Sequence, residues 1–303
     1  MKYSKMFAKT LKAAPSSADT ANHRLLVQAG FVRQVMAGVY TYLPLGLRVL
    51  NKISNIVREE MDRIDAQEVL MPMLHPSALW KQTGGWDKID VLFKIKSRTG
   101  KEYAMSQSNE ETVTPLAKEW IHSAKDLPLA IYHINWKFRD ELRSKSGIMR
   151  GREFLMKDLY SFAATEEQHE AQYAAAREAY KRIFERLGIG DRTYVTFASG
   201  GVFSEFSEEF QTLSEAGEDL IYLDEKTGIA VNKEDLTDAT LAKLGLSRDS
   251  LVEKKAIEAG NIFHLGTRFS ESLGLTYTDA DGSKKPVIRG SYGIGISRML
   301  GIL

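Results

Sequence analysis

Arginines, carboxylates and aromatic residues share one short region of the sequence. It reads Lys137-Phe-Arg-Asp-Glu141, then a loop, then Arg150-Gly-Arg-Glu-Phe-Leu-Met-Lys-Asp-Leu-Tyr160. Alternate side chains of a β-strand point to the same face, so two antiparallel strands would gather one set of these residues on one face. On the first strand the set is Arg139 and Glu141, and on the second it is Arg150, Arg152, Phe154, Met156 and Tyr160.

These residue types suit a nucleotide. The planar guanidinium group of arginine matches phosphate oxygens, an aromatic ring can stack on a base, and a carboxylate can accept a hydrogen bond from an exocyclic amine. The pattern therefore predicts an ATP site on this hairpin. A salt-bridged sheet surface without a ligand is the alternative interpretation, because Arg-x-Glu is common in any chain.

Two further segments carry candidate ligand-binding residues. Ser291-Tyr-Gly-Ile-Gly-Ile-Ser-Arg298 is a strand with glycines that leads into a helix. Such glycines indicate close approach of a ligand or of another backbone, and the segment lacks the third glycine of a dinucleotide fingerprint. Ser106-Gln-Ser-Asn-Glu-Glu-Thr112 is polar and acidic. Taken alone, this second segment is better explained as the start of a helix, where acids favour the positive end of the helix dipole.

The elements that must position these residues can be predicted from periodicity and turn signals. We expect helices at 45–64, 112–122 and 165–187, the last opened by the capping-box candidate Thr165-Glu-Glu-Gln168. We expect strands at 68–72, 92–95, 101–105, 129–162 (a hairpin with a basic loop at 143–148), 208–213 and 275–277, an Asp281-Gly turn, and a glycine-rich finish at 290–301. Strands grouped around helices without strict alternation predict an α+β fold with an antiparallel or mixed sheet.

Composition excludes several other classes of protein. The chain has 303 residues, 43% hydrophobic and 27% charged, which is typical of a globular protein. It contains no cysteine, so disulfide scaffolds, zinc ribbons and cysteine nucleophiles are excluded. No apolar run approaches the roughly eighteen residues of a membrane span, and residues 1–12 do not resemble a secretory signal. The net charge of +1 combines a basic segment at 1–63 with an acidic one at 204–258.

The three chemical segments together resemble a known family. Phe138-Arg-Asp-Glu141 followed by Arg150-x-x-x-Phe154 resembles motif 2 of the class II aminoacyl-tRNA synthetases, and Gly293-Ile-Gly-Ile-Ser-Arg298 resembles their motif 3. The helix at 45–64 with Val69-Leu-Met-Pro72 resembles motif 1. Strings such as Met149-Arg-Gly-Arg-Glu-Phe-Leu-Met-Lys-Asp158 and Ile262-Phe-His-Leu-Gly-Thr267 are similar to the bacterial prolyl-tRNA synthetases. The resemblance implies the class II fold, a central, mostly antiparallel sheet flanked by helices.

The resemblance also implies roles for individual residues. For ATP, Arg139 would bind the α-phosphate, Glu141 the adenine amino group, Arg150 and Arg298 the γ-phosphate, Phe154 the adenine ring, and Gln211 a phosphate, while Glu209 is the candidate for Mg²⁺. For proline, the candidates are Ser108, Glu110, Met156, Tyr160, Phe263, Gly266, Thr267 and Ser291. Ser108 stands at a threonine position of the family, and Ser291 stands where some bacterial relatives have cysteine.

The implied reaction is ATP-dependent activation of L-proline to prolyl-adenylate and transfer of proline to the 3′ end of tRNA(Pro). Arg139 and Glu141 are the implied catalytic residues, with ATP as substrate and Mg²⁺ as cofactor. A homodimer through motif 1 and a cytoplasmic location are further expectations. Two alternatives remain: a non-catalytic paralogue that binds proline or a partner protein, and a class II synthetase fragment for another amino acid such as threonine or histidine.

The resemblance further implies domains that this sequence does not match. We expect one catalytic domain over 1–303, interrupted by a short acidic insertion at about 224–258. That stretch is too short for the editing domain of many bacterial relatives, so we expect no hydrolysis of alanyl-tRNA. The family's anticodon-binding domain would follow motif 3, and the sequence ends within that motif's helix. The histidines have no metal-ligand spacing; five, including His169, are expected to be packing or surface residues, and His264 is left open.

Overall fold

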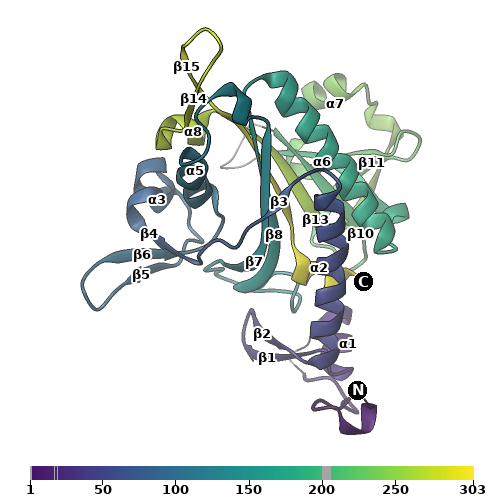
Figure 1. Cartoon of the computed structure of the whole chain (residues 1–303). Coiled ribbons are helices and arrows are strands. Elements are labelled where there is room, and N and C mark those ends of the chain that lie inside the picture. Colours follow the sequence, from purple (N-terminus) through teal and green to yellow (C-terminus); the bar gives the residue numbers. More distant parts are fainter. Residues whose placement is uncertain (1, 17, 19, 200–205) are drawn as a thin grey trace.

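A nine-stranded mixed sheet forms the centre of the computed structural model, which describes residues 2–16, 18, 20–199 and 206–303 (Figure 1). In spatial order its strands are β10 (Phe206–Leu213), β9 (Thr193–Ser199), β12 (Ile229–Asn232), β11 (Asp219–Asp224), β13 (Leu251–Gly266), β16 (Ile288–Ile294), β8 (Glu153–Ala163), β7 (Leu129–Phe138) and β3 (Gln67–Glu68). Only β12 with β9 and β3 with β7 are parallel pairs among these strands. The predicted α+β fold with a mostly antiparallel sheet is confirmed.

The predicted long hairpin is also confirmed. Strands β7 and β8 pair antiparallel from Leu129 opposite Phe162 to Phe138 opposite Glu153. β16 pairs with β8, and β13 pairs with β16, so three strands from distant parts of the sequence lie side by side. In this register Ser291 lies between Tyr160 on one side and Phe263 on the other.

Strands β9 to β13 close into a ring. β10 pairs with β9, β9 with β12, β12 with β11, and β11 with β13; the circuit closes where β10 pairs with the later part of β13. β13 can serve both partners because its 16 residues pair with β11 over 251–256 and with β10 over 256–263. The acidic stretch 224–258, for which no strand or helix was predicted, contributes β12 and the first half of β13 to this ring and carries a helix at Asp238–Leu244 between them.

Three helices cover one face of the sheet, where the largest hydrophobic core lies (Figure 1). They are α2 (Pro44–Asp62), α6 (Glu166–Arg186) and α9 (Ile296–Ile302). The apolar stripe predicted for α2 is buried from Leu50 to Met61, whereas Leu47 stays 47% exposed. The Thr165 hydroxyl caps α6 by accepting from the Gln168 amide N–H at 3.2 Å. The capping box is only half formed, because the Gln168 side chain accepts from Ala164 instead.

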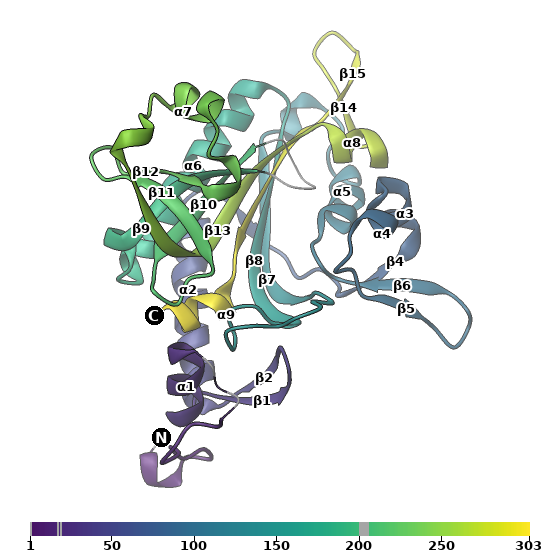
Figure 2. The ribbon, with the colours of Figure 1, turned by 180° about the vertical axis from the view of Figure 1, so that it is seen from behind.

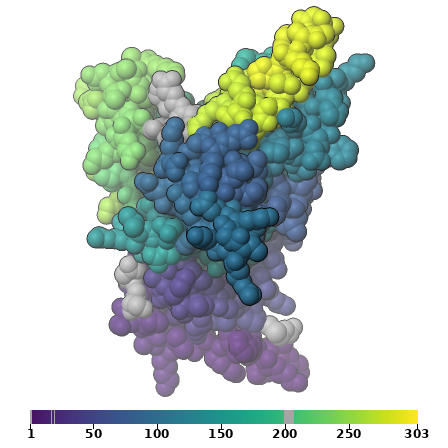
Figure 3. Space-filling view, turned by 90° about the vertical axis from the view of Figure 1, so that its left-hand side faces the viewer, coloured from purple at the N-terminus to yellow at the C-terminus, as the bar shows by residue number. Residues whose placement is uncertain are grey.

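Smaller elements flank the sheet and form two further apolar clusters. Near the amino terminus these elements are α1 (Ala21–Gln28), β1 (Val32–Met36) and β2 (Val39–Tyr42). Beside the sheet they are β4 (Leu74–Pro76), α3 (Ser77–Thr83), α4 (Gly85–Lys88), β5 (Lys94–Lys96), β6 (Glu102–Met105), α5 (Glu110–Lys118), α7 (Asp238–Leu244), α8 (Arg268–Leu273), β14 (Thr276–Thr278) and β15 (Lys284–Pro286). In Figure 3 the green segment carrying α7 and the yellow β14–β15 hairpin project on opposite sides of the molecule.

Two predicted elements have different bounds in the structure. The strand expected at 68–72 ends at Glu68, although the Val69 amide N–H still donates to the Tyr132 carbonyl at 2.8 Å. The helix expected at 112–122 is α5, which begins two residues earlier and ends at Lys118. Among the described residues, no helix has the length and apolar character needed to cross a membrane.

Candidate active site

Figure 2 shows the face of the sheet that points away from α2 and α6. A cavity of about 330 Å³ lies on this face. Its walls come from the β7–β8 loop, β13, β16, the start of α9 and the residues just before β11. Strand alternation decides the face: Asn261 and Phe263 line the cavity, whereas Ile262 between them packs in the core beneath α6. Two of the three segments that the sequence singled out, 137–160 and 291–298, therefore meet at this cavity.

Arg139 is the most deeply placed cation of the cavity. Its guanidinium group lies over the Phe154 ring, 5.2 Å from the ring centroid, and its buried Nε has no hydrogen-bond partner within the described residues. Burial, and after it the charge of Arg298, lowers the pKa of Arg139 below its usual value. A site that concentrates positive charge with unused donors is suited to an anion such as a phosphate.

Two more arginines line the cavity, and each is paired with a carboxylate. The Arg150 Nη2 lies 3.1 Å from Glu141, and the Arg298 Nη1 lies 3.0 Å from Glu258. Arg298 also donates to the backbone carbonyls of Met149 and Glu258, at 3.0 and 2.7 Å. A polyanion entering the cavity would compete with these carboxylates for the guanidinium groups.

Carboxylates and amides gather on the ring side of the cavity. Gln211 Nε2 donates to Glu209 at 2.8 Å and to Asp219 at 3.0 Å, and Asp219 lines the cavity. Burial, followed by the charge of Glu258, raises the pKa of Glu209 to about 8. The amide oxygens of Gln211 and Asn261 are buried without a partner among the described atoms. These oxygens and the crowded carboxylates are suited to a hard cation such as Mg²⁺.

A second group of polar residues lies at the amino-terminal end of α5. Glu110 is only 1% exposed; it accepts from the Ser291 hydroxyl at 2.8 Å and from the Ser108 hydroxyl. The neighbouring Asn109 amide N–H donates to the Tyr160 hydroxyl at 3.0 Å. The buried carboxylate of Glu110 is thus fixed between a strand of the sheet and the loop before α5.

A buried network beneath this group fixes Tyr160. Its hydroxyl donates to Asp158 at 3.1 Å, and Asp158 also forms an ion pair with Lys137 at 2.6 Å and accepts from His133 at 3.0 Å. Although burial opposes it, the charge of Lys137 and the bond from His133 hold the pKa of Asp158 well below its usual value. Asp158 is therefore charged at neutral pH and fixes the orientation of the Tyr160 ring.

The structure brings together many, but not all, of the residues predicted for the site. Those that line the cavity are Arg139, Glu141, Arg150, Phe154, Met156, Phe263 and Arg298. Those in the two neighbouring groups are Glu209 and Gln211, and Ser108, Glu110, Tyr160 and Ser291. Gly266 lies opposite Arg289 in the β13–β16 pair, and the Thr267 hydroxyl donates to Glu271 at 2.7 Å, so neither joins these groups directly.

One premise of the prediction was wrong. β7 ends at Phe138 and β8 begins at Glu153, so Arg139, Glu141 and Arg150 lie in the connecting loop and strand alternation does not set their direction. Arg152 does not share their face: it donates to the carbonyls of Ala37 and Glu141, at 2.8 and 3.0 Å. The loop, not the strands, turns the charged residues toward the cavity.

Comparison with known proteins agrees with this geometry. Residues 93–303 match the tRNA synthetase class II core domain (G, H, P, S and T). Over the whole chain, the sequence is 37% identical to the proline–tRNA ligase of Beijerinckia indica and 39% identical to that of Gluconobacter oxydans. The chain belongs to the proline–tRNA ligase family of class II synthetases. It spans about three quarters of these relatives, 74% and 75% of their lengths.

Solved structures support the same fold for this synthetase. It aligns with prolyl-tRNA synthetase from Cryptosporidium parvum complexed with L-proline and AMP at a TM-score of 0.72 and 16% identity. The alignment covers 96% of this chain and 52% of that one, so the chain spans about half of the solved protein. A complex of the same enzyme with halofuginone and AMPPNP aligns at a TM-score of 0.74 and 17% identity.

Sequence reasoning missed several residues that line the cavity of this synthetase. Asp219 gave no local signal, because only the pairing of β11 with β13 brings it to the cavity. Glu258 and Asn261 lie on β13, just before the family-like string at Ile262. Glu258 could have been found by extending the family-like string at Ile262 four residues toward the amino terminus, to Glu258-x-x-Asn261. Lys137 stands at the start of the hairpin, and its position in the sequence indicated no role. In the structure it forms an ion pair with Asp158.

Proposed function

We propose that the cavity binds ATP, that the group around Glu110 binds L-proline, and that the chain joins the two as prolyl-adenylate before transfer to tRNA(Pro). The observation that carries this proposal is the adjacency of the two groups. Phe263, which lines the cavity, lies opposite Ser291 in the β13–β16 pair, and Ser291 donates to Glu110. This adjacency would place a nucleotide and a small amino acid with a cationic imino group against each other on one sheet face.

In this proposal the nucleotide replaces existing ion pairs. Arg139 binds the α-phosphate with its unused donors, and Phe154 stacks on adenine from the same strand region. Arg150 leaves Glu141 and binds the γ-phosphate, which frees Glu141 to accept from the adenine amino group. Arg298 likewise exchanges Glu258 for phosphate. Each guanidinium group exchanges a charge-assisted bond to a carboxylate for one to a phosphate, so the arginines remain paired when the nucleotide is bound.

Proline is bound by its charge and by its ring. The carboxylate of Glu110 accepts from the cationic imino group, and the Ser108 and Ser291 hydroxyls keep that carboxylate in place. Met156, Tyr160 and Phe263 supply apolar surface for the ring, while Gly266 and Thr267 close the pocket after local adjustment. This assignment makes charge recognition by Glu110 the main determinant of proline affinity.

We propose that the Mg²⁺ of the reaction binds beside the carboxylates of Glu209, Asp219 and Glu258, which form the acid cluster. Glu209 and Gln211 would hold it, with Asp219, Glu258 and Asn261 close by, because their oxygens fit a hard cation. When bound, such an ion neutralises phosphate charge. The chain's own residues orient the substrates: the proline carboxylate attacks the α-phosphorus in line, pyrophosphate leaves, and Arg139 stabilises the charge on the phosphoryl oxygens.

The acid cluster predicts a pH effect on stability. The folded pKa of Glu209, about 8, lies above the unfolded value of 4.5. Between these values the unfolded chain binds fewer protons than the folded chain, so this group's stabilising contribution is lost as pH rises from 4.5 to 8. We expect Glu209→Gln to flatten this fall, measured as urea midpoints at several pH values. Mg²⁺ should also flatten it in the parent chain. An identical pH profile in the variant would refute the assignment.

The specificity of the first step is tested by ATP–pyrophosphate exchange. We expect exchange to be faster with proline than with threonine, histidine, serine or alanine. Exchange driven best by threonine or histidine would identify a different amino acid, and no exchange with any of them would favour a non-catalytic paralogue. The same assay therefore separates the alternatives left open by the sequence.

Domain organisation and partners complete the proposal. The central sheet draws strands from Gln67 to Ile294, which supports one catalytic domain with the ring over 193–199 and 206–266 as an integral part. We propose a homodimer through the motif 1 region, where Leu47 and Leu70 are 47% and 81% exposed. The acceptor end of tRNA(Pro) would reach the open side of the cavity, and the cytoplasm is the compartment that such a partner implies.

A further inference from the structure

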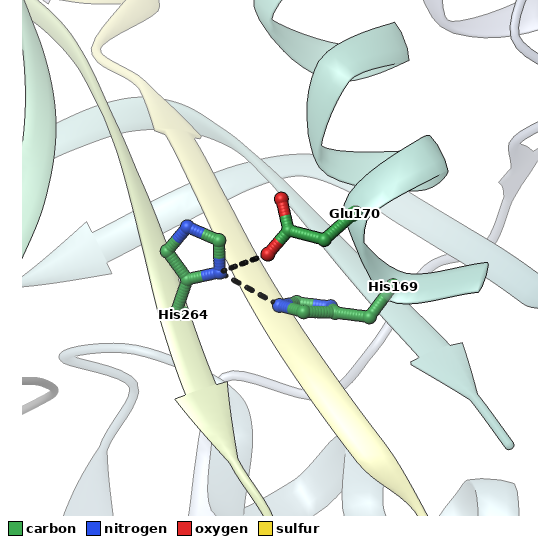
Figure 4. A group of neighbouring side chains, drawn as sticks. All are labelled: His169, Glu170 and His264. Atoms are coloured by element: carbon green, nitrogen blue, oxygen red, sulfur yellow. Dashed lines mark hydrogen bonds and ion pairs between the residues drawn. The ribbon is translucent and has the colours of Figure 1, made fainter. Parts of the chain in front are cut away.

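Two histidines and a glutamate meet on the sheet face opposite the cavity. His169 Nε2 and His264 Nδ1 are 2.8 Å apart, and a Glu170 carboxylate oxygen lies 3.9 Å from the same His264 nitrogen (Figure 4). One potential ligand atom from each residue lies within 4.8 Å of the others. Within the part of the chain that the structure describes, this histidine cluster is the one such group of three. None of its members has a role in the proposed reaction.

Rigid elements position the histidine cluster. His169 and Glu170 lie in consecutive positions near the start of α6, whose first residue is fixed by the Thr165 cap. His264 lies on β13 and points away from the cavity, because its neighbour Phe263 faces the cavity. The Tyr173 ring stacks on His264 with centroids 3.8 Å apart and an angle of 15° between the planes. Both imidazoles are therefore held by packing before any ligand arrives.

Exposure differs among the three side chains in a way that suits an ion entering from solvent. The His169 side chain is buried, that of His264 is 41% exposed and that of Glu170 is 64% exposed. Burial is the main cause that lowers the pKa values of His169 and His264 below 6.5. Both rings are thus neutral at pH 7 and can offer nitrogen lone pairs, as metal binding requires.

We propose that His169, Glu170 and His264 form a binding site for one divalent transition-metal ion of the zinc type. Two imidazole nitrogens and one carboxylate are a donor set that Zn²⁺ accepts, with water in the fourth position. Mg²⁺ prefers oxygen ligands, so this site and the acid cluster differ in metal preference. Bonds of about 2.0–2.1 Å in a tetrahedral site require the two nitrogens to separate by a few tenths of an ångström beyond 2.8 Å.

The bound ion would join α6 to β13 and so would stabilise the folded chain by mass action. The spacing of His169 from other histidines matches no metal motif and by itself predicts a packing or surface residue. His169 and His264 are 95 positions apart in sequence, and only the packing of α6 on β13 brings them together.

Titration of the untagged chain with Co²⁺ and Zn²⁺, without ATP or proline, tests the proposal. We expect one ion per chain by calorimetry, a visible Co²⁺ spectrum of low coordination number, and a higher thermal midpoint with Zn²⁺. His264→Gln and Glu170→Gln should each weaken binding by at least about tenfold, in line with the roughly 10–100-fold cost of losing even an outer-shell partner. Glu170 is exposed, so its variant should fold normally.

Two matched controls separate this site from others. His122→Gln removes an exposed histidine elsewhere, and Glu209→Gln alters the acid cluster; both should bind Co²⁺ like the parent chain. Absence of stoichiometric binding, or equal binding by the parent chain and both cluster variants, would overturn the proposal. Loss of binding only in Glu209→Gln would assign the ion to the acid cluster and would overturn it as well.

Discussion

Replacing Arg139 with alanine is expected to reduce proline-dependent ATP–pyrophosphate exchange by about a hundredfold or more. Removing one preorganised charge contact to a developing transition-state charge typically costs roughly 10²–10³ in rate, or about 2.7–4 kcal/mol. Among the described residues, the buried Arg139 Nε has no hydrogen-bond partner, so it is available to a phosphate, and the guanidinium is held over the Phe154 ring before substrate binds. The effect should therefore appear mainly in kcat.

Arg143→Ala is the matched control for this experiment. Arg143 belongs to the same loop but is exposed and does not line the cavity. Its removal changes the net charge by the same amount and should leave exchange nearly unchanged. If the two variants exchange at the same rate, or if Arg139→Ala keeps the parent rate, the phosphate assignment is wrong.

Glu110→Gln is expected to raise the KM for proline by roughly a hundredfold, with little change in the KM for ATP. Glu110 is 1% exposed and is fixed by the Ser291 and Ser108 hydroxyls, so its charge is available to the imino group in a site with little water. Breaking a buried charge pair by removing one partner costs about 3–5 kcal/mol. The variant keeps the shape of the side chain, so packing around α5 should survive.

The adjacent Glu111 provides the control. It is also buried, but it accepts from the Thr83 hydroxyl at 2.9 Å. Burial and the charge of Glu110 raise the pKa of Glu111 to about 7, so a neutral glutamine resembles one of its ordinary states. We expect Glu111→Gln to leave the KM for proline nearly unchanged. An equal rise in both variants would show that the effect comes from disturbance of α5 and not from loss of a substrate contact.

Local signals allowed much of the fold to be predicted. The β7–β8 hairpin follows from alternation on either side of the basic loop, and α6 follows from the Thr165 cap and its apolar stripe. The short edge strand before Pro72 was predicted too long, because propensity carries no information about whether a neighbour is available to pair. In the structure, only Gln67 and Glu68 pair with a neighbouring strand, which is β7.

Long-range pairing explains what the sequence could not provide. Phe210 meets Gly260, and an irregularity at Phe210 and Gln211 shifts the register that follows. No local sequence signal near Phe210 or Gly260 indicates this pairing. The ring was therefore not predicted, and neither was the position of Asp219 and Glu258 in the cavity wall. Arg139, Arg150 and Arg298 line one cavity as expected, whereas Arg152 does not; Arg139 and Arg150 lie in a loop that alternation treated as strand.

The ring of strands β9 to β13 has a consequence for how copies of the chain meet. Both sides of β10 are paired, with β9 and with β13, so the sheet does not present an open edge to another molecule at that end. The other end finishes in β3, whose two residues are too few to template a long intermolecular ladder. At the β10 end, the architecture thus limits edge-to-edge pairing between copies of the chain.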